Sequence, residues 1–173
     1  GNEIWAYYAG WSLSDSVPFN TAIGFAKSND DGLFYKKEGK GPVLSYSLDE
    51  PYLISGPKIR KFADKFYLFY IAGRKWLKIN NKFEMSLKIK LAISKNGIDW
   101  KKQNKNLIKD EIGINESQAS PDVFYHDNKY HMFFDYWDPY TFRKTGSRKI
   151  GYAFSHDLIN WTRQDSLAGI DTS

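Results

Sequence analysis

Short hydrophobic stretches separated by polar turns run along the whole chain. The clearest stretch reads F-Y-L-F-Y-I-A at 66–72, and its alternating positions are apolar on both sides of an extended strand. A strand with two apolar faces is typical of a sheet that is covered on both faces by neighbouring sheets. The pattern therefore predicts an all-β fold of stacked sheets.

A short phrase occurs three times along the chain. It reads S-K-N-G-I-D-W at 94–100, S-H-D-L-I-N-W at 155–161 and, more loosely, S-N-D-D-G-L-F at 28–34. In each copy the serine follows an apolar lead-in and precedes an aromatic residue by six positions. Such a phrase indicates a strand, a tight polar turn and a return strand anchored by a large aromatic side chain.

An upstream half precedes the second and third copies of the phrase. The stretch G-P-K-I-R-K-F-A-D-K-F-Y-L-F-Y at 56–70 aligns without a gap with S-P-D-V-F-Y-H-D-N-K-Y-H-M-F-F at 120–134. Proline suits the first position of a strand, A-D-K and D-N-K suit a turn, and the aromatic run suits a second strand. Together with the phrase, each unit has four antiparallel strands, as a propeller blade does.

The repeat divides the single domain of residues 1–173 into three blade units at about 3–48, 49–115 and 116–165. The first unit lacks an inner strand, because 3–11 matches a second strand and 22–37 match a third and fourth. Three blades cannot close a ring, since closed propellers typically have at least four. We therefore expect about three blades of a larger propeller, or a ring that another chain completes, as in a homo-oligomer.

Composition agrees with a folded β domain, since 42% of the residues are hydrophobic and 17% are aromatic. Without cysteine, disulfides and thiolate metal sites are excluded, and the three histidines lack metal-ligand spacing, so we expect no metal and no cofactor. No apolar run reaches the ~18 residues of a membrane span, and no signal peptide is visible, which leaves cytoplasmic and secreted locations open. The net charge of +5 is typical of a solvated surface, so neither a membrane nor a nucleic acid is the expected partner.

Four motifs in order carry a resemblance to a known family. They are Y-Y-A-G-W at 7–11, E-P-Y-L-I-S-G-P at 50–57, E-S-Q-A-S-P at 116–121 and G-Y-A-F-S-H-D-L-I-N-W-T-R-Q-D at 151–165. With the blade turns, the chain resembles the five-bladed β-propeller glycosidases of glycoside hydrolase families 43 and 32, and more closely some uncharacterised bacterial relatives from polysaccharide gene clusters. The resemblance implies a glycosidase-like protein that acts on a bacterial poly- or oligosaccharide.

Glycoside cleavage needs one carboxylic acid that protonates the leaving oxygen and one carboxylate that activates water or attacks the sugar. The resemblance implies that these groups lie on or just before the innermost strands of the blades. Glu116 and Glu50 occupy that place in the third and second units and are the leading catalytic candidates, with Asp49 and Asp122 as alternates. The bacterial relatives have aspartate where this chain has Glu50, so the role is less directly transferred there.

Aromatic residues at strand ends and in loops can stack on the apolar face of a sugar ring. These residues and two polar neighbours make up the predicted substrate-binding set, which is Trp11, Trp76, Tyr136, Trp137, Tyr140, Arg74 and Asp138. Two alternatives to hydrolysis stay open: a propeller that binds a glycan without cleaving it, and a propeller that serves as a platform for protein partners.

Overall fold

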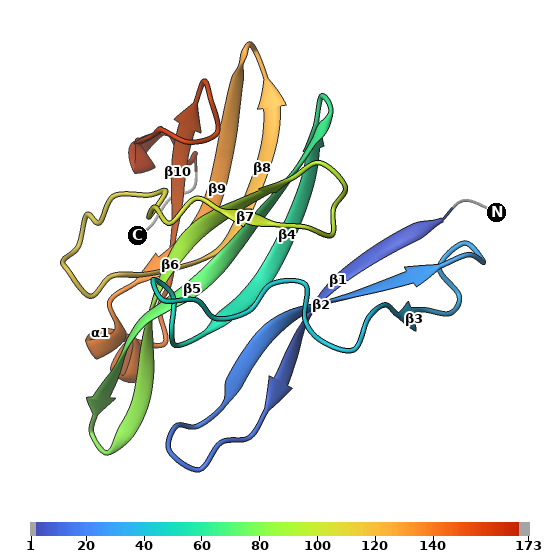
Figure 1. Cartoon of the computed structure of the whole chain (residues 1–173). Coiled ribbons are helices and arrows are strands. Elements are labelled where there is room, and N and C mark those ends of the chain that lie inside the picture. Colours follow the sequence, from blue (N-terminus) through green and yellow to red (C-terminus); the bar gives the residue numbers. More distant parts are fainter. Residues whose placement is uncertain (1–2, 170–173) are drawn as a thin grey trace.

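The computed structural model describes residues 3–169, apart from the side chain of Arg143. Its strands form three antiparallel sheets that follow one another along the chain (Figure 1). The first sheet has three strands, β1 (Ile4–Ser12), β2 (Asn20–Ser28) and β3 (Lys36–Lys37). The second has four, β4 (Ile54–Phe62), β5 (Lys65–Ile79), β6 (Lys82–Ser94) and β7 (Lys101–Lys102). The third also has four, β8 (Ser117–His126), β9 (Lys129–Trp137), β10 (Lys149–Ser155) and β11 (Trp161–Arg163).

Strands that follow one another in sequence are neighbours within every sheet. This order is that of propeller blades, and it confirms the predicted all-β fold of about three blades with a first blade that is one strand short. The helical elements are short, α1 (Pro139–Thr145) and the 3₁₀ turn η1 (Asp165–Leu167). No helix among the described residues has the length and apolar character of a membrane span.

The serine of the repeated phrase closes the turn between the third and fourth strands of each blade. In all three copies it is buried at the end of a strand, and its hydroxyl accepts a hydrogen bond from a backbone N–H three or four residues later. The pairs, each at 2.9 Å, are Ser28 with Gly32, Ser94 with Gly97 and Ser155 with Leu158. The phrase recurs because this turn needs a short side chain that can bond to its own backbone.

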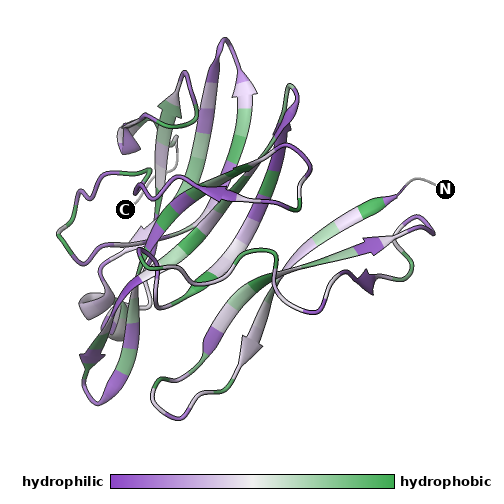
Figure 2. Cartoon of the chain, viewed as in Figure 1, coloured by the Kyte–Doolittle hydropathy of each residue, from purple (hydrophilic) through white to green (hydrophobic). Residues whose placement is uncertain are grey.

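Two hydrophobic cores join the sheets. Between the first and second sheets lie Ile23, Leu68 and Tyr70, and between the second and third lie Phe69 and Met132. Adjacent residues of β5 thus point to opposite neighbours, as the two apolar faces of 66–72 predict. Figure 2 shows hydrophobic positions alternating with polar ones along the strands of all three sheets.

The segment after position 72 lies outside the aligned repeat and is not a loop. Instead, β5 and β6 continue as one long hairpin, in which Ile79 is paired with Lys82. Leu77, Ile79 and Met85 are buried, so the hairpin is held by packing of its apolar side chains. The part of this hairpin after position 72, called the overhang below, extends past the end of the blade and carries aromatic residues there.

Helix α1 is the second unpredicted element. Asp138 caps its amino end by accepting a hydrogen bond from the Tyr140 N–H at 2.9 Å, and Pro139 stands in the first turn. Gly146 ends the helix with a φ of 65°, a left-handed conformation that glycine adopts readily. The capping signals were present in the sequence, since aspartate followed by proline is a common helix start.

Candidate functional site

Glu50 lies four residues before the start of β4 and is only 1% exposed. Its two carboxylate oxygens accept hydrogen bonds from the Tyr70 hydroxyl at 3.0 and 2.9 Å, and Lys102 Nζ lies 2.8 Å from Oε2. Lys90 Nζ adds a longer contact at 3.8 Å. Burial, and then the adjacent Glu50 carboxylate, raise the pKa of Tyr70, so its hydroxyl stays protonated and donates to Glu50.

Glu116 lies directly before β8 and is also 1% exposed. Its Oε1 accepts hydrogen bonds from Arg163 Nη1 at 2.6 Å and Gln118 Nε2 at 2.8 Å. Its Oε2 accepts from the backbone N–H groups of Glu111 and Ile112 at 2.9 and 3.0 Å. Four donors therefore surround one buried carboxylate.

The two glutamates lie in the segments before the inner strands of successive blades, at positions that differ by two residues in the repeat, and their cationic partners occupy equivalent positions. Lys102 and Arg163 each follow the tryptophan of the repeated phrase by two residues, on β7 and β11. A buried acid therefore joins the segment before the inner strand to the outermost strand of the same blade. The oxygens of Glu50 and Glu116 are enclosed by protein donors, and neither residue lines the aromatic cavity described below. Their catalytic role stays a prediction.

The alternates Asp49 and Asp122 are exposed. Asp49 accepts a hydrogen bond from the Asn104 side chain at 2.8 Å. Asp122 forms an ion pair with Arg60, which links β8 to β4 across the boundary between two sheets. Neither aspartate lines the cavity described next.

A cavity of about 560 Å³ lies where the three sheets approach one another, a size within the range of small-molecule sites. Three of the predicted sugar-contacting residues line it, Trp11 at the end of β1, Trp76 on the long hairpin and Trp137 at the end of β9. Phe19 connects two of them, with its ring centroid 4.5 Å from Trp11 and 5.5 Å from Trp76. Phe83 adds another aromatic side chain to the cavity wall.

Polar groups interrupt this aromatic wall. Ser55, Ser120, Lys58, Glu84 and Arg148 line the cavity together with the rings. Two β-bulges bring the inner strands towards it, at residues 56–57 of β4 and 120–121 of β8. Such bulges redirect a strand locally and are common beside active sites.

Arg148 is held in place at one end of the cavity. Its guanidinium lies over the Trp137 ring, 4.1 Å from the centroid, and Nη1 bonds to the Asp135 carboxylate at 2.6 Å. Stacking and the ion pair together fix the orientation of the planar donor group. The cavity therefore combines flat apolar surface with an oriented hydrogen-bond donor.

Four predicted binding residues do not line this cavity. Arg74 is exposed and donates to the Ile114 carbonyl at 2.7 Å, while Asp138 and Tyr140 belong to the start of α1. Tyr136 is buried in the core between the second and third sheets, where Arg163 lies 4.3 Å from its ring centroid. Burial raises the pKa of Tyr136, with the Asp165 carboxylate adding to the shift. Sugar contact by Tyr136 stays a prediction.

Among the cavity residues that the sequence-based set missed, five lie outside the aligned repeat: Phe19, Phe83, Glu84, Phe142 and Arg148. All five lie in segments between the repeated strands or at the ends of long hairpins, where the repeat gives no alignment. Their position outside the repeat was the available signal, as it was for Trp11 and Trp76. Among residues 3–169, no three His, Asp or Glu side chains are grouped so that they could hold a metal ion.

Comparison with known proteins supports the same fold as the sheet order does. No protein-family profile matches the chain. The chain is 26% identical over all 173 residues to an uncharacterised protein of Mycobacterium tuberculosis, MT1551, and it spans about half (54%) of that relative's length.

Among solved structures, it aligns with a Bombyx mori GH32 β-fructofuranosidase, BmSUC1, at a TM-score of 0.71 and 22% identity, covering 95% of this chain and 34% of the enzyme. A glycosyl hydrolase from Bacteroides ovatus gives a TM-score of 0.66 at 20% identity, covering 96% of this chain and 47% of that protein. The chain has the propeller fold of glycosidases. A structure from the GH130 family of mannoside phosphorylases and hydrolases extends this likeness, with a TM-score of 0.69 at 21% identity over 98% of this chain and 46% of that one.

Proposed function

We propose that this protein is part of a carbohydrate-active propeller and that the aromatic-walled cavity binds a sugar. The convergence of rings from all three sheets carries the proposal, because Trp11, Trp76 and Trp137 are far apart in sequence and line one cavity. Flat aromatic faces suit the C–H faces of a sugar ring, and a few fixed polar groups suit its hydroxyls. The propeller glycosidase fold supports the same ligand class.

Hydrolysis of a glycosidic bond is the second candidate activity. One observation favours it: Glu84 is half-buried and lines the cavity together with the aromatic residues Trp76 and Phe83 of the same hairpin. A carboxyl group beside a bound sugar can supply or accept the proton that glycoside cleavage requires. In this proposal Glu84 replaces Glu50 and Glu116 as the carboxylate that meets the sugar.

Binding can be tested with Trp76→Ala against a matched variant, Phe34→Ala, which removes a ring that is 79% exposed and outside the cavity. Sucrose, bound in one structural neighbour, and β-1,2-mannobiose, bound in another, are suitable first probes beside a panel of bacterial oligosaccharides. We expect Trp76→Ala to weaken binding at least about tenfold, equivalent to ~1.4 kcal/mol, with Phe34→Ala unchanged. Equal affinity of both variants and the parent protein would remove the cavity from sugar binding.

Hydrolysis is tested by release of reducing sugar from any glycan that binds. Glu84→Gln should abolish release and leave binding in place, whereas Glu111→Gln, the same change at an exposed position, should leave both intact. Binding without product in every version would favour the non-catalytic glycan-binding propeller. If the protein binds none of the sugars and instead captures a protein partner, the interaction-platform alternative replaces both proposals.

A further inference from the structure

The polar side chains of the aromatic-walled cavity are rich in hydrogen-bond donors. Three residues that line it, Lys58, Trp137 and Arg148, carry N–H groups and no acceptor atom. Among the described residues of the lining, one is an acid, Glu84 on β6. Such an excess of donors suits a ligand group that accepts hydrogen bonds and does not donate them.

The indole N–H of Trp137 is a donor without an acceptor. Trp137 is 6% exposed, and its Nε1 atom is buried with no hydrogen-bond partner among the residues that the structure describes. Buried polar groups in folded proteins are nearly always hydrogen-bonded, so an exception needs an explanation. Because Trp137 lines the cavity, an acceptor atom of a bound ligand supplies one.

Arg148 places further donors beside this N–H. Its guanidinium lies over the Trp137 ring, and it also lies 5.3 Å from the centroid of Phe142. Asp135 accepts a hydrogen bond from Nη1 and is itself outside the cavity lining. A guanidinium has five N–H donors, so most of them remain for a ligand. Its planar fork matches the two oxygens of a carboxylate.

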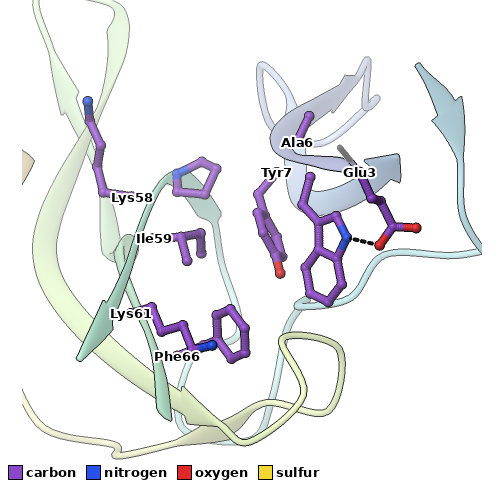
Figure 3. A pocket seen from close by; sticks show the side chains of 9 residues that line it. Glu3, Ala6, Tyr7, Lys58, Ile59, Lys61 and Phe66 are labelled. Atoms are coloured by element: carbon purple, nitrogen blue, oxygen red, sulfur yellow. Dashed lines mark hydrogen bonds between the residues drawn. The ribbon is translucent and has the colours of Figure 1, made fainter. Parts of the chain in front are cut away.

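A second hollow, the groove of about 580 Å³ between β1 and β4, differs in this respect (Figure 3). There the Trp5 indole N–H donates to the Glu3 carboxylate, as the dashed line in Figure 3 marks. Lys58 lies at the rim of both hollows, and Figure 3 shows its ammonium group turned away from the aromatic side chains of the groove. The tryptophan donor of the groove is thus satisfied within the chain, whereas that of the cavity is not.

We propose that the sugar bound in the cavity carries a carboxylate, as a uronic acid does, and that Arg148 and the Trp137 N–H bind this group. Lys58 adds positive charge to the same cavity. The rings then have different roles, since Trp11 and Trp76 remain for stacking on the sugar and Trp137, with Arg148 over its face, acts as a donor. The inference rests on the proposed sugar binding and names the class of sugar.

Paired ligands test the carboxylate separately from sugar binding. Trigalacturonate and cellobiouronate are each compared with their methyl esters, which keep the rings and hydroxyls and lose the charge. In calorimetric titrations we expect each acid that binds to do so at least tenfold more tightly than its ester. Equal affinities, or binding of neutral sugars alone, would overturn the inference and leave sugar binding in place. No binding of any acid, ester or neutral sugar would overturn both.

Variants test the two assigned residues through the ratio of acid to ester affinity, which a general loss of stability does not change. Arg148→Gln should lower this ratio to about twofold or less. Trp137→Phe, which keeps an aromatic ring and removes the N–H, should lower it at least threefold. A ratio that stays at the parent value in both variants would overturn the proposal.

Two lysines of β4 provide a matched pair for the charge. Lys58→Gln should lower the ratio, whereas Lys61→Gln, the same change three residues along the strand and outside the cavity, should leave it unchanged. Equal effects of the two substitutions would contradict a local contribution from Lys58. Inorganic phosphate that displaces the ester as strongly as the acid does would overturn the proposal in favour of a general anion site.

Discussion

Replacing Glu116 by glutamine is expected to lower the stability of the folded chain, because this carboxylate is a buried structural contact. The carboxylate accepts hydrogen bonds from four donors, the closest of which is Arg163 Nη1 at 2.6 Å. A glutamine amide has one oxygen, so its NH₂ group would face two of these donors in either orientation. The substitution therefore leaves buried donors without an acceptor and removes one partner of a buried ion pair.

The expected loss of unfolding free energy can be estimated from the same contacts. Removing one partner of a buried ion pair typically costs about 3–5 kcal/mol. Asp165 stays 2.8 Å from Arg163 and continues to neutralise it, which places the expected loss near the lower end of that range. A domain of this size loses roughly 2–4 °C of melting temperature for each kcal/mol, so Glu116→Gln should lower Tm by about 10 °C.

The assay is urea and thermal unfolding followed by circular dichroism. Glu111→Gln is the matched control, because it is the same chemical change five residues away on an exposed side chain, and its effect should stay within about 0.5 kcal/mol. Glu50→Gln should behave like Glu116→Gln, since Tyr70 and Lys102 hold it in the same way. A loss below about 1 kcal/mol for Glu116→Gln would refute the structural role.

Two further predictions concern packing and titration. Gly151→Ala should destabilise the chain more than Gly24→Ala. The added methyl group would come within 2.4 Å of the buried Phe134 ring in the first case and within 2.3 Å of the half-exposed Tyr8 ring in the second, and Tyr8 has more room to move. Equal losses of unfolding free energy in urea would contradict this reasoning. Burial raises the pKa of Tyr7 to about 12, so the stability it contributes is fully present below about pH 10 and is lost as the pH rises towards 12. Tyr7→Phe should flatten that decline, and an unchanged decline would show that other groups cause it.

The fold could be predicted from the sequence because turn geometry fixes residue types locally. The Ser94 hydroxyl closes its turn by accepting a hydrogen bond from the Gly97 N–H three residues later, so the same letters recur wherever the turn recurs. The two apolar faces of 66–72 likewise follow from the position of β5 between two sheets. These are short-range or periodic requirements, and a single sequence displays them.

The site was predicted only in part, for physical reasons that differ between residues. Trp11, Trp76 and Trp137 stood apart from the strand pattern, and the structure brings them to one cavity. Glu116 could not be recognised as an interior residue, because its partner Arg163 is distant in sequence and only the folded blade brings them together. The overhang that carries Glu84 has no counterpart in the other units, so the repeat gave no guide to it.

The tryptophan side chains offer the most direct test of the central claim that the cavity binds sugar. The chain has six, of which three line the cavity and three lie elsewhere. The cavity set is Trp11, Trp76 and Trp137, and the internal control set is Trp5, Trp100 and Trp161. In an NMR titration with a glycan from the panel, the indole N–H signals of the cavity set should shift in proportion to saturation while those of the control set stay in place. Shifts confined to the control set, or no shift at any glycan tested, would contradict the account.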